Sequence, residues 1–105
     1  MLLIREVMYC KPGKVKPLVK IFLSMSKLNQ KMGMGKMRVM TDVSGERYWT
    51  LVAEMEVESL AAFERMMAGE GMNEADMKEF EKEMGNYHDY VDHGKREIYK
   101  IEGTV

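Results

Sequence analysis

The chain contains little cysteine, proline or tryptophan, with one, two and one of these residues among its 105. The single cysteine, Cys10, excludes an internal disulfide and any cysteine-based zinc cluster, and we expect it to be a small buried hydrophobe. No apolar run approaches the roughly 20 residues of a membrane helix. The opening segment is charged at Arg5 and Glu6, too early for a secretory signal, so we expect a cytoplasmic protein without membrane attachment.

Several catalytic motifs are also absent. The sequence has no glycine-rich phosphate loop, no Gly-x-Ser-x-Gly elbow and no Cys-x-x-Cys pair, which disfavours nucleotide-dependent, serine-hydrolase and thioredoxin-like chemistry. The net charge is only −1, and basic and aromatic residues alternate too rarely in the expected strands for RNA recognition. A nucleic-acid partner is therefore not expected.

Methionine, by contrast, is abundant, with thirteen residues in the chain. Methionine fills irregular gaps and lines adaptable pockets, so this number suggests a soft cavity or interface. A core that tolerates methionine in place of leucine would explain it equally well. With 46% apolar and 31% charged residues, the composition is that of one globular domain spanning 1–105.

Charge is divided unevenly along the chain. Residues 1–40 hold nine Lys or Arg and one acid, a balance of +8, whereas residues 41–105 hold seven bases and sixteen acids, a balance of −9. If both helical segments cover one face of a sheet, a basic first helix lies beside an acidic second one. We expect this complementarity to act within one chain or between subunits.

Hydrophobic periodicity predicts seven elements. They are a strand at 2–10, a helix from about 16 to 32, strands at 36–43 and 47–57 joined by a turn at 44–46, a helix at 58–68, a helix from 74 to about 93, and a strand at 95–101. Ser59 and Asn73 are the expected N-caps of the later helices. Gly94 is the expected end of the last helix.

This βαββαβ order predicts an α+β, ferredoxin-like fold, with helices on one face of a four-stranded antiparallel sheet. On the third strand, alternation places Trp49, Leu51 and Ala53 toward the helices and Tyr48, Thr50 and Val52 on the other face. All four strands carry apolar residues on both faces. Because one chain can cover only one face, we expect a homodimer whose two sheets pack together as a dimeric α/β barrel.

Both ends of the chain resemble a known family. Segment 4–15, in which a strand runs into the turn Lys11-Pro12-Gly13-Lys14 and a helix, resembles the start of NIPSNAP-type domains, and segment 94–101 is similar to the last strand of bacterial relatives. The resemblance implies the dimeric α/β-barrel superfamily. That superfamily includes cofactor-independent monooxygenases of the antibiotic-biosynthesis type, haem-degrading enzymes, isomerases and members without an assigned activity. No cofactor is expected here.

The richest polar cluster is segment 87–93, with His88 and His93. On a continuous helix these histidines are five residues apart, about 140° around the axis, so they cannot easily share a metal ion and no metal site is expected. His93 would favour the helix C-terminus. His88 is a candidate general base at the cavity edge. The alternative is that His88 is a half-buried polar tip beside the apolar stripe.

Haem-degrading relatives pair a strand tryptophan with an asparagine on the first strand. The first strand expected here contains no asparagine, so we expect Trp49 to be a core residue at the pocket wall. Residues with hydrogen-bond donors or apolar bulk complete the candidate ligand pocket. These are Tyr9, Arg38, Tyr48, Tyr99, Tyr87 and Met84. Each also fits an ordinary structural role, the tyrosines as packing residues and Arg38 as a solvated charge.

The expected function is binding of a small apolar or aromatic molecule in a cavity between sheet and helices. One alternative is a cofactor-independent monooxygenase or isomerase acting on an aromatic, polyketide-like substrate. His88 would then be the base, and Tyr9 or Arg38 would hold the substrate oxygen. The other alternative is a structural or partner-binding homodimer without catalysis, its assembly guided by the uneven charge.

Overall fold

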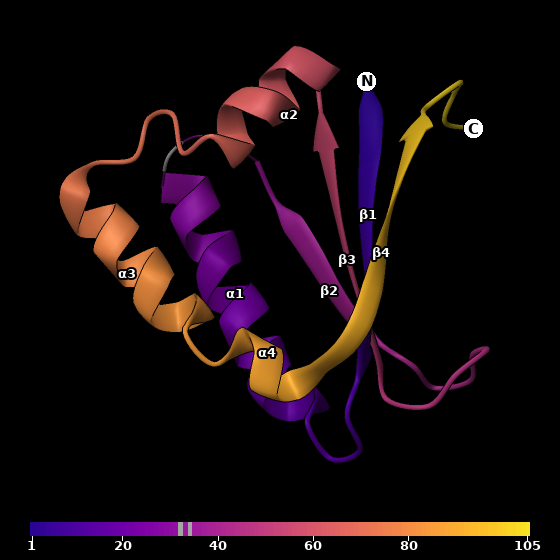
Figure 1. The fold of residues 1–105 in the computed structure, drawn as a ribbon. Coiled ribbons are helices and arrows are strands. Elements are labelled where there is room, and N and C mark those ends of the chain that lie inside the picture. The colour runs from indigo at the N-terminus through magenta and orange to yellow at the C-terminus, as the bar shows by residue number, and fades with distance from the viewer. Residues whose placement is uncertain (32, 34) are drawn as a thin grey trace.

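The structure, a computed structural model, describes residues 1–31, 33 and 35–105 (Figure 1). Its elements are β1 (Leu2–Cys10), α1 (Val15–Lys31), β2 (Met37–Thr41), β3 (Thr50–Val57), α2 (Leu60–Met67), α3 (Glu74–Met84), α4 (Tyr87–Tyr90) and β4 (Val91–Lys100). The four strands form an antiparallel sheet in the order β2-β3-β1-β4. The helices gather on one face of this sheet, and the other face is uncovered (Figure 1). The predicted α+β, ferredoxin-like fold is confirmed.

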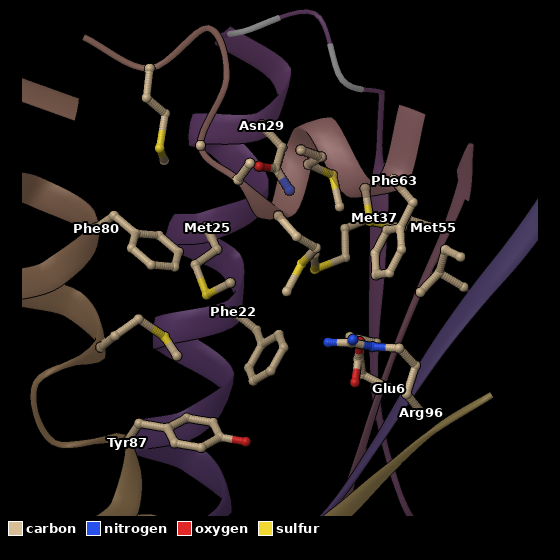
Figure 2. Close-up of a pocket in the computed structure, with 18 of the residues that line it drawn as sticks. Glu6, Phe22, Met25, Asn29, Met37, Met55, Phe63, Phe80, Tyr87 and Arg96 are labelled. Carbon is tan, nitrogen blue, oxygen red and sulfur yellow. The ribbon is translucent and has the colours of Figure 1, made fainter. Parts of the chain in front are cut away.

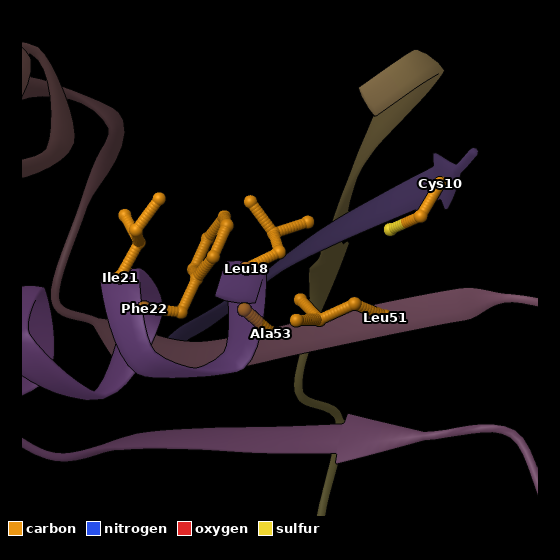
Figure 3. Packing of buried hydrophobic residues seen from close by; sticks show 6 residues of the cluster. All are labelled: Cys10, Leu18, Ile21, Phe22, Leu51 and Ala53. Atoms are coloured by element: carbon orange, nitrogen blue, oxygen red, sulfur yellow. The ribbon is translucent and has the colours of Figure 1, made fainter. Parts of the chain in front are cut away.

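The main core lies between α1 and the two central strands (Figure 3). From α1, Leu18 and Phe22 are buried against Leu51 and Ala53 of β3. The 3.6-residue period of the helix and the two-residue period of the strand place these side chains on facing surfaces. The predicted helix-facing side of β3 is therefore correct for Leu51 and Ala53. Cys10 is buried at 7% exposure, as expected.

Both predicted N-caps are confirmed. The Ser59 Oγ accepts a hydrogen bond from the Ala62 backbone N–H at 3.1 Å, and the Asn73 side chain accepts one from the Asp76 N–H at 2.8 Å. The carboxylate of Asp76, buried at 4% exposure, also lies 3.1 Å from the Lys31 Nζ at the end of α1. A basic and an acidic helix therefore lie side by side and are linked within one chain.

The connection between β2 and β3 is longer than predicted. The strands end at Thr41 and resume at Thr50, so residues 42–49 form the loop instead of 44–46. Asp42 closes this loop by accepting a hydrogen bond from the Thr50 N–H at 2.8 Å. Trp49 has φ 62°, a left-handed conformation that interrupts an extended strand. The predictions that Trp49 is a core residue and that Tyr48 belongs to the strand are wrong: they are 44% and 87% exposed.

The last helix ends earlier than predicted. Helix α3 ends at Met84, α4 spans only four residues, and Val91 already pairs with Cys10 as the start of β4. The Lys11 N–H donates to the Tyr90 carbonyl at 2.9 Å and fixes this transition. Strand pairing with β1 therefore determines the structure here, although the apolar stripe suggested a helix through Val91. The expectation that His88 and His93 lie on one continuous helix is wrong, because His93 lies in β4.

Gly94 lies inside β4, opposite Met8, and does not end a helix. A Cβ atom at this position would lie 2.7 Å from the Met8 Sδ and 2.9 Å from the Val7 carbonyl oxygen. Because a backbone atom is among these neighbours, the strand must shift to accept a side chain. We expect Gly94→Ala to lower the free energy of unfolding by roughly 1–3 kcal/mol, measured by urea denaturation. Gly103→Ala, with nothing within 4 Å of its Cβ, is the control, and equal effects of the two would contradict the close approach.

No helix in the described ranges is both long and apolar enough to span a bilayer.

Candidate functional site

A cavity of about 480 Å³ lies between the sheet and the helices. Methionine dominates its wall, with residues contributed by β1, α1, β2, β3, α2, the loop that follows α2, and α3. Among the residues that the structure describes, the lining methionines are Met8, Met25, Met37, Met55, Met66, Met67, Met72, Met77 and Met84. Unbranched thioether side chains adapt to differently shaped apolar molecules. The high methionine content of the sequence is therefore concentrated around one cavity.

Aromatic side chains complete the apolar wall. Phe22 from α1, Phe63 from α2 and Phe80 from α3 line the cavity, and Tyr87 closes it at the α4 end (Figure 2). Pockets of about 300–1,000 Å³ with apolar walls and few polar groups are typical of small-molecule sites. The cavity therefore has the size and the surface of a small-molecule site.

Glu6 and Arg96 form a charged pair on the sheet side of this wall. They are direct cross-strand partners of β1 and β4, the Arg96 Nε donates to Glu6 Oε1, and both side chains point into the cavity (Figure 2). The Arg96 guanidinium carbon also lies 5.0 Å from the centroid of the Phe63 ring, within cation–π distance. Two contacts therefore fix the guanidinium at the cavity surface.

Tyr87 brings a hydroxyl group to the same cavity. The hydroxyl donates to the Met8 Sδ at 2.9 Å. Burial raises the pKa of Tyr87 above its ordinary value, and the Glu6 carboxylate and Cys10 raise it further, against the opposing effect of Arg96. The phenol consequently stays protonated at neutral pH and acts as a hydrogen-bond donor.

Two of the predicted site residues, Arg38 and Tyr99, lie on the uncovered face of the sheet, away from this cavity. Arg38 belongs to a row of charged cross-strand partners that crosses all four strands, with Glu54, Arg5 and Glu97. Arg38 Nη2 lies 2.7 Å from Glu54 Oε1, and Arg5 Nε lies 3.8 Å from Glu54 and 3.9 Å from Glu97. The Tyr99 hydroxyl donates to Glu97 at 2.8 Å, and this bond is the main reason that the pKa of Tyr99 is raised.

Tyr9 lies on the uncovered face as well, at its end near the 42–49 loop. Its ring centroid is 4.8 Å from that of His93 and 4.6 Å from the Arg47 guanidinium carbon. Arg47 Nη1 is also 2.9 Å from His93 Nε2. Tyr48 and Trp49 line a shallow depression beside this cluster with Arg47, and neither lines the methionine-rich cavity.

His88 is exposed on α4 and does not line the methionine-rich cavity. Its ring makes an edge contact with Tyr87 at 5.3 Å between centroids. The expected half-buried position at the cavity edge is wrong, because Tyr87 and not His88 faces inward on this short helix. Within the described part of the chain, His, Cys, Asp and Glu residues form no group of three that could hold a metal.

Of the residues predicted for the pocket, only Met84 and Tyr87 meet in the methionine-rich cavity. Glu6 and Arg96 were missed. A signal was present for Glu6, since the two-residue period of a strand places it on the same face as Ile4 and Met8. Arg96 could be found only through the register that pairs it with Glu6.

Cys10 is the only thiol in the chain. Burial raises its pKa above the ordinary value, and the Asp42 carboxylate raises it further. Since the thiolate is the reactive form, we expect alkylation by iodoacetamide near pH 8 to be at least about tenfold slower in the native protein than in urea. Mass spectrometry measures both rates. Equal rates would show that Cys10 is accessible in the native chain.

No protein-family model matches the chain, and no curated protein matches it either. Several solved structures do match the chain in their fold. Protein Atu4242 from Agrobacterium tumefaciens superposes with a TM-score of 0.72 at 17% identity, covering 95% of this chain and 92% of that protein. An uncharacterized NIPSNAP domain protein from Burkholderia xenovorans gives 0.70 at 16% identity, with 100% and 98% covered. An antibiotic biosynthesis monooxygenase gives 0.70 at 12% identity, with 98% and 100% covered. This chain therefore has the fold of NIPSNAP-domain and antibiotic-biosynthesis-monooxygenase proteins.

Proposed function

We propose that this protein binds a small apolar or aromatic molecule in the cavity between its sheet and its helices. The supporting observation is the cavity itself, about 480 Å³ in volume and lined by nine of the methionines that the structure describes. Burial of apolar ligand surface against such a wall contributes roughly 25 cal/mol per Å² before the costs of association. The flexible thioethers would adapt the wall to the shape of the ligand.

A titration with N-phenyl-1-naphthylamine tests this proposal, because this uncharged aromatic probe fluoresces strongly in apolar surroundings. We expect saturable binding of one probe per chain. In Met84→Trp, a larger side chain enters the cavity, and we expect at least about tenfold weaker binding. Leu23→Trp, on the outer surface of α1 at 47% exposure, is the matched control and should bind normally. Absence of saturable binding, or the same affinity in both variants, would refute the cavity as the site.

The uncovered sheet face supports assembly with a second copy of the chain. Alongside the charged row it carries Val7, Val52 and Met40, which are cross-strand neighbours. The sequence resemblance to the dimeric α/β-barrel superfamily implies that the sheets of two chains pack together. In a homodimer the two faces would cover each other, and the charged rows would fix their register more than they would add stability. A dimer without a cavity ligand would instead favour the structural role.

A cofactor-independent oxygenase is the second candidate, favoured by the likeness to an antibiotic biosynthesis monooxygenase. In this chain, the carboxylate of Glu6 faces the cavity from the sheet and Glu81 lines it from α3, whereas His88 is exposed outside it. Oxygen uptake in the presence of a phenolic aromatic substrate tests the activity. Uptake abolished by Glu6→Gln and retained by His88→Ala would support an oxygenase with a carboxylate base. Uptake lost in His88→Ala would contradict that assignment.

A further inference from the structure

The charged residues of the cavity wall are few and differ in what they offer a ligand. Glu6 and Arg96 face the cavity as a pair, and Glu81 also lines it (Figure 2). Glu54 is among the lining residues, but its carboxylate is bonded to Arg38 on the uncovered face. The Glu6–Arg96 pair is therefore the charged pair on the sheet side of the wall, whereas Asn29, Glu81 and Tyr87 are polar residues that line the cavity from the helix side.

This pair leaves hydrogen-bonding capacity on both partners. A guanidinium has five N–H donors and a carboxylate two acceptor oxygens, and the Nε–Oε1 bond uses one of each. A hydroxyl group is both donor and acceptor, so it can accept from Arg96 and donate to Glu6 at once. The Phe63 ring, 5.0 Å from the guanidinium carbon, limits the movement of Arg96 away from this arrangement.

Tyr87 offers a third polar contact across the cavity. Its hydroxyl donates to the Met8 Sδ at 2.9 Å, and a thioether sulfur is only a weak acceptor. A ligand oxygen is a better acceptor, so the phenol can turn to it without losing a strong bond. Burial and Glu6 raise the pKa of Tyr87, which keeps this donor protonated.

We propose that the cavity selects uncharged amphiphiles, with an apolar body against the methionines and a single hydroxyl group bound between Glu6 and Arg96. This specificity rests on the proposed function and extends it to a ligand class. Fatty alcohols and alkyl phenols are the simplest members. The hydroxyl adds one hydrogen bond to each of the two charged groups and brings no charge into the cavity.

Charged analogues are disfavoured by the same geometry. A carboxylate that approaches Arg96 also approaches Glu6, so attraction and repulsion largely cancel while the anion still loses its water. An ammonium ion is attracted by Glu6 and repelled by Arg96, so the two interactions again oppose each other. A wall with one unpaired charge would behave differently, because it would attract the ion of opposite sign.

Competition against N-phenyl-1-naphthylamine with three ten-carbon ligands tests the inference. They are 1-decanol, decanoate and decylammonium, at about pH 8, where a carboxyl of pKa about 4–5 and an amine of pKa about 10 are both charged. We expect decanol to displace the probe from the wild-type protein at a concentration at least about tenfold below that of either ion. Equal displacement by decanoate or decylammonium would overturn the inference. Failure of the probe itself to bind would instead refute the proposed function.

Two variants locate the effect at the charged pair. In Glu6→Gln the guanidinium loses its counter-charge, and decanoate should gain at least about tenfold relative to decanol. In Arg96→Gln the carboxylate is unpaired, and decylammonium should gain instead. Glu64→Gln, an exposed position on α2, is the matched control and should keep the wild-type order. If the three ligands displace the probe in the same order of affinity in both pair variants, Glu6 and Arg96 are excluded as the selecting groups. If either variant fails to fold, the order of the three ligands in the wild-type protein still decides the inference.

Discussion

Leu18→Ala is expected to lower the free energy of unfolding by roughly 2–5 kcal/mol, a large share of the total for a domain of this size. Leu18 is fully buried and belongs to the cluster in which α1 packs on β3, with Leu51 and Ala53 among its members (Figure 3). Removing the isobutyl group takes its apolar surface out of the core and leaves a void that the sheet and helix close only in part. Urea denaturation followed by circular dichroism measures the change.

Leu23→Ala on the same helix is the matched control. Leu23 is 47% exposed, so its truncation should change stability by no more than about 0.5 kcal/mol. All variants are compared at one protein concentration, because association would make the apparent stability depend on it. Similar losses for Leu18→Ala and Leu23→Ala would show that α1 does not bury the face assigned to it.

Predictions from local patterns succeeded where the pattern has one structural solution. The alternation that placed Leu51 and Ala53 toward the helices is confirmed, because both are buried, whereas Trp49 at the start of the same pattern is exposed. Ser59 and Asn73 were identified as N-caps because a short polar side chain before an apolar helical stripe has a specific role there. These features depend on neighbours a few residues away.

Predictions failed where distant segments decide the structure. The spacing of Met84, Tyr87 and Val91 suits a helix, yet Val91 pairs with Cys10 and begins β4. Gly94 resembled a helix end for the same reason, although its missing side chain accommodates Met8 in the neighbouring strand. Pairing between residues about eighty positions apart has no local signature, so hydrophobic periodicity alone favours the helix.

The candidate site was predicted less well than the fold for a related reason. A charged residue in a strand is usually solvated, so Glu6 was not counted as a cavity residue. Its partner Arg96 lies ninety positions later in the chain, and only the observed register brings the two together. The tyrosines illustrate the opposite error: Tyr9 and Tyr99 alternate onto the uncovered face, and Tyr48 lies in a loop. The methionine content suggested a soft cavity or interface, with a methionine-tolerant core as the alternative, and it did not show which polar groups face a cavity.

The surroundings of Val52 make it the position at which a charge would most affect the proposed dimer. Val52 lies on β3 between Met40 of β2 and Val7 of β1, at the centre of the uncovered face. In a single chain Val52 is partly exposed, although Val7 beside it is buried at 5% exposure, so a carboxylate at position 52 can reach water. Between two sheets the same carboxylate is desolvated, and Arg38 in the adjacent row is already bonded to Glu54.

Val52→Glu is therefore expected to weaken dimerisation by roughly 3–5 kcal/mol, which raises the dissociation constant about 10²- to 10⁴-fold. Sedimentation equilibrium at several micromolar concentrations should find a dimer for the wild-type chain and a folded monomer for Val52→Glu. Leu23→Glu places the same charge on the exposed side of α1 and should remain dimeric. A monomeric wild-type protein would refute assembly through the sheets. A Val52→Glu dimer as stable as the wild type would show that the chains associate through a different surface. Burying an additional carboxylate between the two sheets raises the free energy of the dimer.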